Sequence, residues 1–120
     1  AVFDALGAWF NGKGPKGVPF CGCMFVNAAA EYATLENPIH GVAAEHKRLI
    51  MDYLEKLATQ AGFNNPQRLA LQLSILKEGA INTAHVMGRA ESAGEAKEVA
   101  RLLLEVADET SLYSYSVAIL

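Results

Sequence analysis

The sequence lacks the features that mark several classes of protein. No apolar run approaches the length of a transmembrane helix, and residues 1–10 have neither the basic region nor the cleavage site of a secretory signal. No run of lysine and arginine occurs, and the net charge is −3, so the electrostatic signature of nucleic-acid binding is missing. We therefore expect a cytoplasmic chain that does not enter a membrane and does not bind DNA by itself.

Cysteine and histidine are also scarce. Cys21 and Cys23 are one residue apart, which would strain a disulfide, and a structural zinc site needs four ligands. No cation adjoins them in the sequence to stabilise a thiolate, so small buried side chains are favoured over an oxidant sensor. The step from His40 to His46 misses the spacing that aligns ligands on a helix. We expect no metal site and no cofactor.

Apolar residues, by contrast, are plentiful: they make up 52% of the 120 residues. A chain of this length can build a core without disulfides or metals, and the apolar surplus suggests a partner subunit or a lined cavity. We expect one domain over residues 1–110, followed by a tail over residues 111–120. The tail alternates apolar and polar residues with a period of two, which predicts a strand.

Helical periodicity predicts an all-α fold. Five helices are expected, at residues 1–10, 24–32, 38–61, 66–87 and 92–107. The pairs Asn37-Pro38 and Asn65-Pro66 are typical of helix starts, because asparagine caps the first turn and proline is tolerated within it. At the fifth helix, Ser92 and Glu95 have the spacing of a capping box.

The last two of these helices carry more apolar surface than one core needs. Leu71 and Ile75 widen the apolar arc of the fourth helix, and Leu102 widens that of the fifth. Two consecutive helices of this kind favour a homodimer. The expected interface residues are Leu71, Ile75, Val86, Val99, Leu102, Leu103 and Val106.

Four stretches carry a family resemblance: residues 1–10 (AVFDALGAWF), 22–32 (GCMFVNAAAEY), 44–48 (AEHKR) and 76–80 (LKEGA). In order and spacing they resemble successive parts of the C-terminal domain of tetracycline-repressor-type transcription regulators, up to about residue 107. The resemblance implies a five-helix bundle whose last two long helices pair with those of a second copy. It also implies a parent protein with an N-terminal helix-turn-helix domain, which these residues do not contain. DNA recognition would belong to that parent alone.

The resemblance places an apolar ligand cavity among the first helices and their connecting loop, where aromatic residues gather. Asn27 and Glu31 are four residues apart and could orient a ligand by hydrogen bonds. Each aromatic side chain could instead be plain core, and the polar pair a solvated face. The expected ligand-binding residues are Trp9, Phe10, Phe20, Phe25, Asn27, Glu31, Tyr53 and Thr83.

These implications describe a homodimeric regulator that binds a small apolar or amphipathic effector. In the family, the effector usually relieves repression by changing the separation of the two DNA-reading heads. The alternative is a stand-alone helical dimerisation module without a ligand pocket. A small helical enzyme could offer only Glu31, Glu45 and His46 as titratable groups. No nucleophile with a histidine and an acid partner can be assembled, so we expect no enzyme and no catalytic residues.

Overall fold

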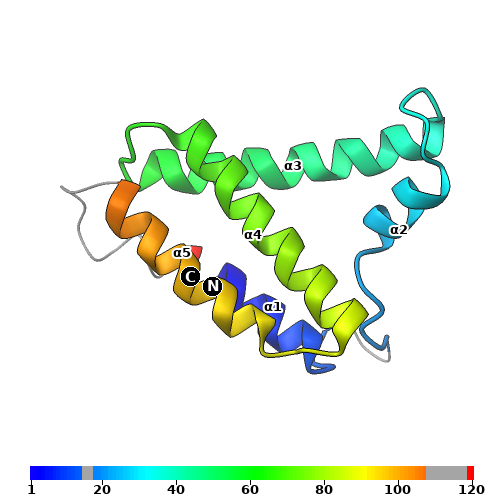
Figure 1. The fold of residues 1–120 in the computed structure, drawn as a ribbon. Coiled ribbons are helices and arrows are strands. Elements are labelled where there is room, and N and C mark those ends of the chain that lie inside the picture. The colour runs from blue at the N-terminus through cyan, green and yellow to red at the C-terminus, as the bar shows by residue number, and fades with distance from the viewer. Residues whose placement is uncertain (15–17, 108–118) are drawn as a thin grey trace.

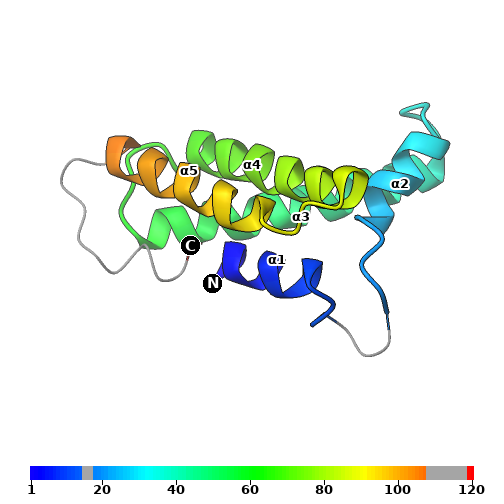
Figure 2. The same ribbon diagram turned by 60° about the horizontal axis from the view of Figure 1, so that its bottom comes forward.

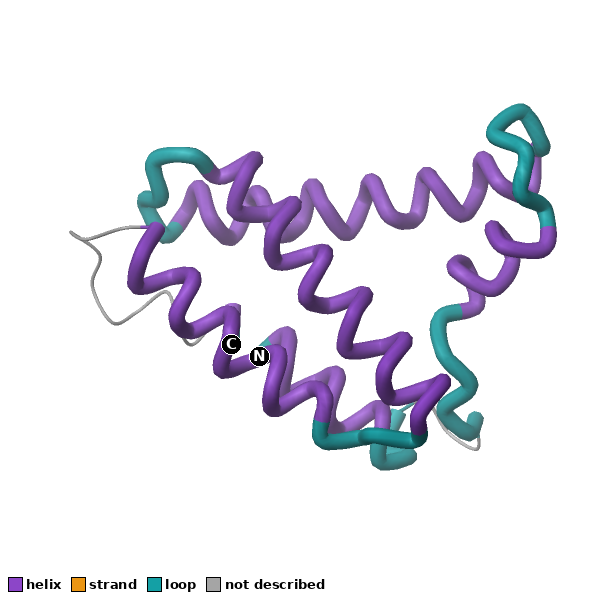
Figure 3. Tube along the Cα trace, viewed as in Figure 1, coloured by secondary structure: helices purple, strands orange, loops and turns teal. Residues whose placement is uncertain are grey.

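Five α-helices build the fold of the computed structural model, which describes residues 1–14, 18–107 and 119–120. Only helices and loops occur within those ranges (Figure 3), so the all-α prediction is confirmed. The observed helix bounds agree with the predicted ones to within one residue. The strand was predicted for the tail at residues 111–120. Of that segment, only residues 119 and 120 lie within the described ranges. The helices are α1 (Val2–Phe10), α2 (Met24–Glu31), α3 (Pro38–Gln60), α4 (Pro66–Met87) and α5 (Ser92–Ala107).

The two asparagine-proline pairs begin the two long helices, as predicted. The side chain of Asn37 accepts a hydrogen bond from the backbone N–H of Ile39 at 2.9 Å. The side chain of Asn65 accepts one from the N–H of Arg68 at 3.2 Å. Each asparagine thereby satisfies a donor that the first helical turn leaves without a partner. At its other end α4 is capped by Gly88, the residue after Met87, whose φ of 67° favours glycine.

The predicted capping box at the start of α5 is wrong. The Ser92 hydroxyl donates to the backbone oxygen of Ala80 on α4 at 2.8 Å, and the N–H of Glu95 donates to the oxygen of Glu91. Ser92 is buried between the two helices, so its hydroxyl must find an acceptor there. The serine therefore ties α5 to α4 instead of capping α5.

Helix α4 is central to the packing. Helices α3 and α5 both pack against it, α1 packs against α5 and α4, and α2 packs against α3 (Figure 1). Figure 2 shows α1 beneath the layer that α4 and α5 form. None of the described helices is long and apolar enough to cross a membrane. The largest fully buried side chains of this core are Phe3, Leu54, Leu73, Leu104 and Ile119.

Candidate ligand-binding cavity

A cavity of about 880 Å³ opens between α1, the loop that precedes α2, α2 itself, α3 and α4. Helix α1 contributes Ala5, Leu6 and Trp9 to its wall, while α3 contributes Ile50 and α4 contributes Ile81. These side chains are apolar, and the cavity is more than twice the volume of four further hollows of about 300–400 Å³ on the described part of the chain. The wall combines a large apolar surface with the few polar groups described below, as ligand pockets commonly do.

Three aromatic rings pack together where α1 meets the loop. Trp9 and Phe20 meet edge to face with ring centroids 4.8 Å apart, and the Phe10 ring lies 4.8 Å from Phe20 and 6.0 Å from Trp9. Trp9 lines the cavity, whereas Phe10 and Phe20 line a neighbouring hollow of about 400 Å³ with Ala84 and His85. The aromatic cluster therefore separates the two hollows and supports the Trp9 ring from behind.

The turn from Cys21 to Cys23 forms the rim of the cavity. Gly22 adopts a φ of +79°, and a Cβ atom there would lie 2.6 Å from Nδ1 of His85. The side-chain amide of Asn27 donates to the backbone oxygen of Cys21 at 3.3 Å. Only glycine allows both the backbone conformation and the close approach to α4. The turn buries the Cys23 side chain, whose Sγ contacts Lys47 of α3, and leaves Cys21 exposed.

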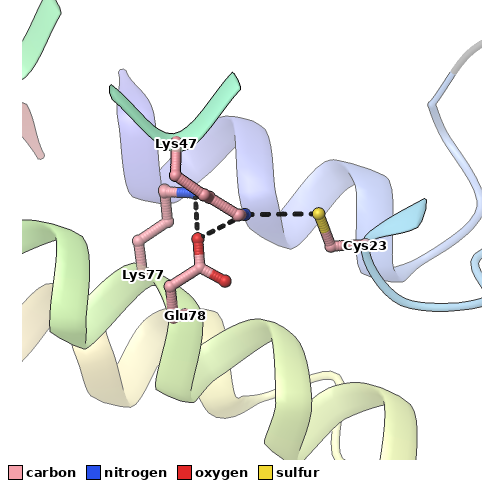
Figure 4. A network of polar contacts seen from close by, with 4 residues as sticks. All are labelled: Cys23, Lys47, Lys77 and Glu78. Carbon is pink, nitrogen blue, oxygen red and sulfur yellow. Dashed lines mark hydrogen bonds and ion pairs between the residues drawn. The ribbon is translucent and has the colours of Figure 1, made fainter. Parts of the chain in front are cut away.

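A polar cluster interrupts the apolar wall where α3 faces α4 (Figure 4). Lys47 on α3 donates to Oε1 of Glu78 at 2.6 Å and to Sγ of Cys23 at 3.3 Å. Lys77 on α4 donates to the same Glu78 oxygen at 2.8 Å. Burial opposes ionisation of Glu78, but hydrogen bonds and charges from both lysines outweigh it and hold the pKa of this carboxyl below its ordinary value.

His46 lies next to this cluster and stacks on Phe25. The two rings are nearly parallel, with centroids 3.8 Å apart, and both residues line the cavity. Burial holds the pKa of the imidazole below its ordinary value, and repulsion from Lys47 and Lys77 adds to the effect against a weaker attraction to Glu78. The lowered pKa favours the uncharged form of His46, so the two lysines are the main source of positive charge in the wall.

The structure brings together some of the predicted ligand-binding residues and separates others. Trp9, Phe25 and Asn27 line the cavity. Phe10 and Phe20 lie behind Trp9, as described above. Of the rest, Glu31 and Tyr53 are exposed outside the cavity lining.

Thr83 lines a different hollow, a groove of about 350 Å³ between α4 and α5. It is therefore not part of the wall of the main cavity, which Trp9 lines.

Sequence reasoning missed the lysines. Lys47 follows Ala43 by one helical turn and precedes Ile50 on the inward stripe of α3. Lys77 sits between Leu73 and Ile81 on the buried stripe of α4. The signal that could have found both was a charged residue at an apolar position of a helical repeat, which requires a specific partner when buried.

The predicted dimer residues form an exposed apolar face on the outer side of α4 and α5. Steps of four and eleven residues return a helix to nearly the same direction, which places Leu71, Ile75 and Val86 on one side of α4. All the predicted interface residues except Leu103 are exposed in the single chain. Leu103 is half-buried and packs against the core. The face, as found, is defined by Leu71, Ile75, Val86, Val99, Leu102 and Val106.

The three titratable residues named for the enzyme alternative do not lie together in one site. Glu31 is exposed at the end of α2, and Glu45 forms a surface ion pair with Arg48 on its own helix. His46 alone lines the cavity. In the described part of the chain, no group of three histidine, cysteine, aspartate or glutamate side chains could hold a metal ion.

Comparison with family models, curated proteins and solved structures finds no match to this chain.

Proposed function

We propose that the chain is the effector-binding and dimerisation domain of a tetracycline-repressor-type transcription regulator. The cavity of about 880 Å³ carries the proposal, because its size lies within the range of pockets that hold small organic ligands. Trp9, Ile50 and Ile81 make its wall largely apolar, which favours an apolar or amphipathic effector. Such a regulator works in the cytoplasm and reads DNA through a helix-turn-helix domain of the parent protein.

The exposed apolar face on α4 and α5 supports the dimer part of the proposal. Apolar patches of this kind on a monomer are typical of protein–protein interfaces. Two copies that pair these helices would form a four-helix bundle, an arrangement that buries apolar stripes on adjacent helices efficiently. A second copy of the chain is therefore the partner that this face fits best.

Helix α4 couples the two surfaces. Lys77 and Ile81 face the cavity, while Ile75 and Val86 belong to the outer face. A ligand that contacts α4 from one side can favour one arrangement of the dimer on the other. It does so only through its difference in affinity for the two arrangements, and a tenfold preference supplies about 1.4 kcal/mol. In the parent, release from DNA follows when the favoured arrangement misplaces the two DNA-reading heads.

Intrinsic fluorescence tests the ligand-binding function directly, because Trp9 is the single tryptophan and lines the cavity. A neutral phenylnaphthylamine dye should bind with saturation and quench Trp9 by energy transfer. Ile50→Asn, which puts an amide into the apolar wall, should weaken binding by about tenfold. Leu49→Asn is the matched control, because Leu49 is the neighbour of Ile50 on α3 but is exposed and lies outside the cavity lining.

Two results would count against this function. Binding without saturation would favour the alternative function, a stand-alone dimerisation module without a ligand pocket. Equal weakening by Ile50→Asn and Leu49→Asn, with both variants folded by circular dichroism, would place the bound dye outside the cavity.

A further inference from the structure

Lys47 and Lys77 occupy positions where the partial burial of a charged side chain is energetically unfavourable without strong binding partners. Both lie on stripes that otherwise bury apolar side chains, and Lys77 is only 8% exposed. A lysine is rarely buried to this extent, because moving an ammonium out of water has to be compensated by strong partners. The partners on the protein side are Glu78 and the Cys23 thiol alone among the described residues.

Those partners do not balance the two ammonium groups. Two positive charges face one carboxylate, which leaves one positive charge without a counterpart in the cluster. Both lysines donate to the same oxygen of Glu78, and the other acceptor of Lys47 is a thiol, which is a weak one. Three of the six N–H donors of the two ammonium groups make no hydrogen bond to the described residues, and the second oxygen of Glu78 is buried without a partner.

The cavity wall itself supplies no anion. Its titratable nitrogen groups are Lys47, Lys77 and His46, and its lining contains no aspartate or glutamate among the described residues. On the α1 side, Leu6 and Trp9 make the wall apolar. The cavity thus combines positive charge on α3 and α4 with an apolar surface on α1.

We propose that the ligand of this cavity is an amphipathic carboxylate, whose head group binds Lys47 and Lys77 while its apolar body packs against Leu6 and Trp9. This inference rests on the proposed ligand-binding function. A carboxylate oxygen is a much stronger acceptor for Lys47 than the Cys23 thiol, and charge-assisted hydrogen bonds are shorter and stronger than neutral ones. The bound head group also neutralises the remaining positive charge of the cluster.

A matched set of ten-carbon ligands tests the head group. Decanoate, decanol and decyltrimethylammonium share the same chain, and Trp9 fluorescence with calorimetry measures their affinities for the complete chain. We expect decanoate to bind at least about tenfold more tightly than decanol, and the cationic ligand to bind most weakly. The preference for decanoate should shrink as salt is added, because salt screens partly exposed charges.

Variants with opposite expected effects locate the head group. Lys47→Met should abolish most of the preference for decanoate over decanol and leave decanol binding within about twofold. Glu78→Gln should strengthen decanoate binding, because it removes the competing carboxylate. Lys56→Met is the control: it removes an exposed lysine of α3 outside the cavity lining and should change neither affinity.

The outcomes separate this inference from the function on which it rests. Equal binding of decanoate and decanol would overturn the carboxylate assignment and leave the ligand-binding function standing. A decanoate preference that survives Lys47→Met, or one that is lost equally in Lys56→Met, would also overturn it. Failure of all three ligands and of the neutral dye to bind would overturn both.

Discussion

The molecule has two apolar surfaces, and they differ in shape and in the charges placed on them. The cavity is concave and carries Lys47 and Lys77 among its apolar residues. The outer face of α4 and α5 follows two adjacent helices, and the residues that define it, among them Ile75 and Leu102, are all aliphatic. Composition alone does not distinguish the two surfaces. Their geometry does, because a concave wall with a few polar groups suits a small molecule, while a helix pair suits a second helix pair.

The largest expected effect comes from placing a charge on the outer face. Leu102→Glu should weaken self-association at least about 100-fold, roughly 2.7 kcal/mol, because each dimer would bury two carboxylates without partners. Leu102 is 61% exposed in the single chain, so the change should leave the monomer fold intact. Sedimentation equilibrium measures the dissociation constant, and circular dichroism checks the fold.

Leu35→Glu is the matched control for that variant. Leu35 is 79% exposed and lies in the turn before α3, away from α4 and α5. Its replacement should leave self-association unchanged. A dimer that tolerates Leu102→Glu, or a wild-type chain that stays monomeric at high concentration, would remove the outer face from the proposed interface. Leu103 is a poorer probe, since it packs partly against the core and its replacement also affects folding.

A smaller effect is expected from the charges of the cavity wall. Glu78→Gln should lower the free energy of unfolding at pH 7 by about 1–3 kcal/mol, because two part-buried ammonium groups lose their carboxylate. The pKa of Glu78 is lowered in the folded state, so its contribution is present at neutral pH and is lost as the pH falls through that lowered pKa. The difference between wild type and variant should therefore shrink on acidification.

Urea denaturation at neutral and acidic pH measures this dependence. Glu45→Gln is the control, because Glu45 pairs with Arg48 at an exposed site where ion pairs contribute little. We expect it to change stability by less than about 0.5 kcal/mol at either pH. A Glu78→Gln effect that is independent of pH would mean that packing, and not charge, accounts for the loss.

Local signals in the sequence were sufficient for the helices. Asn37 and Asn65 cap the long helices through contacts with residues two and three positions away, so the information lies within one turn. The capping box at Ser92 failed for the opposite reason. Its hydroxyl donates to the backbone oxygen of Ala80, twelve residues away on another helix, and the Glu95 N–H that a capping box would use donates to the Glu91 oxygen instead.

The candidate site was predictable only in part. Trp9 and Phe25 were found because aromatic residues cluster on the first helices, but the separation of Thr83 and Tyr53 from them depends on how the helices pack. The polar cluster joins Lys47 to Glu78 across 31 residues, and no local pattern specifies that pairing. The interruption of an apolar stripe by Lys77 indicates a special position without identifying its partner.

The smallest expected effect tests how tightly the cavity rim fits against α4. Gly22→Ala should lower the free energy of unfolding by about 1–2 kcal/mol, since alanine disfavours a φ of +79° and its Cβ would meet the His85 ring. Gly41→Ala should instead raise stability by about 0.5–1 kcal/mol, because Gly41 lies in α3 with open space around it. Urea denaturation measures both, and the double variant Gly22→Ala with His85→Ala separates backbone strain from the clash. If His85→Ala restores most of the loss, the ring contact sets the fit of the rim; if it restores none, the backbone conformation does. A Gly22→Ala chain as stable as wild type would mean that the rim adjusts freely, and the cavity would then lose the fixed wall that distinguishes it from the outer face.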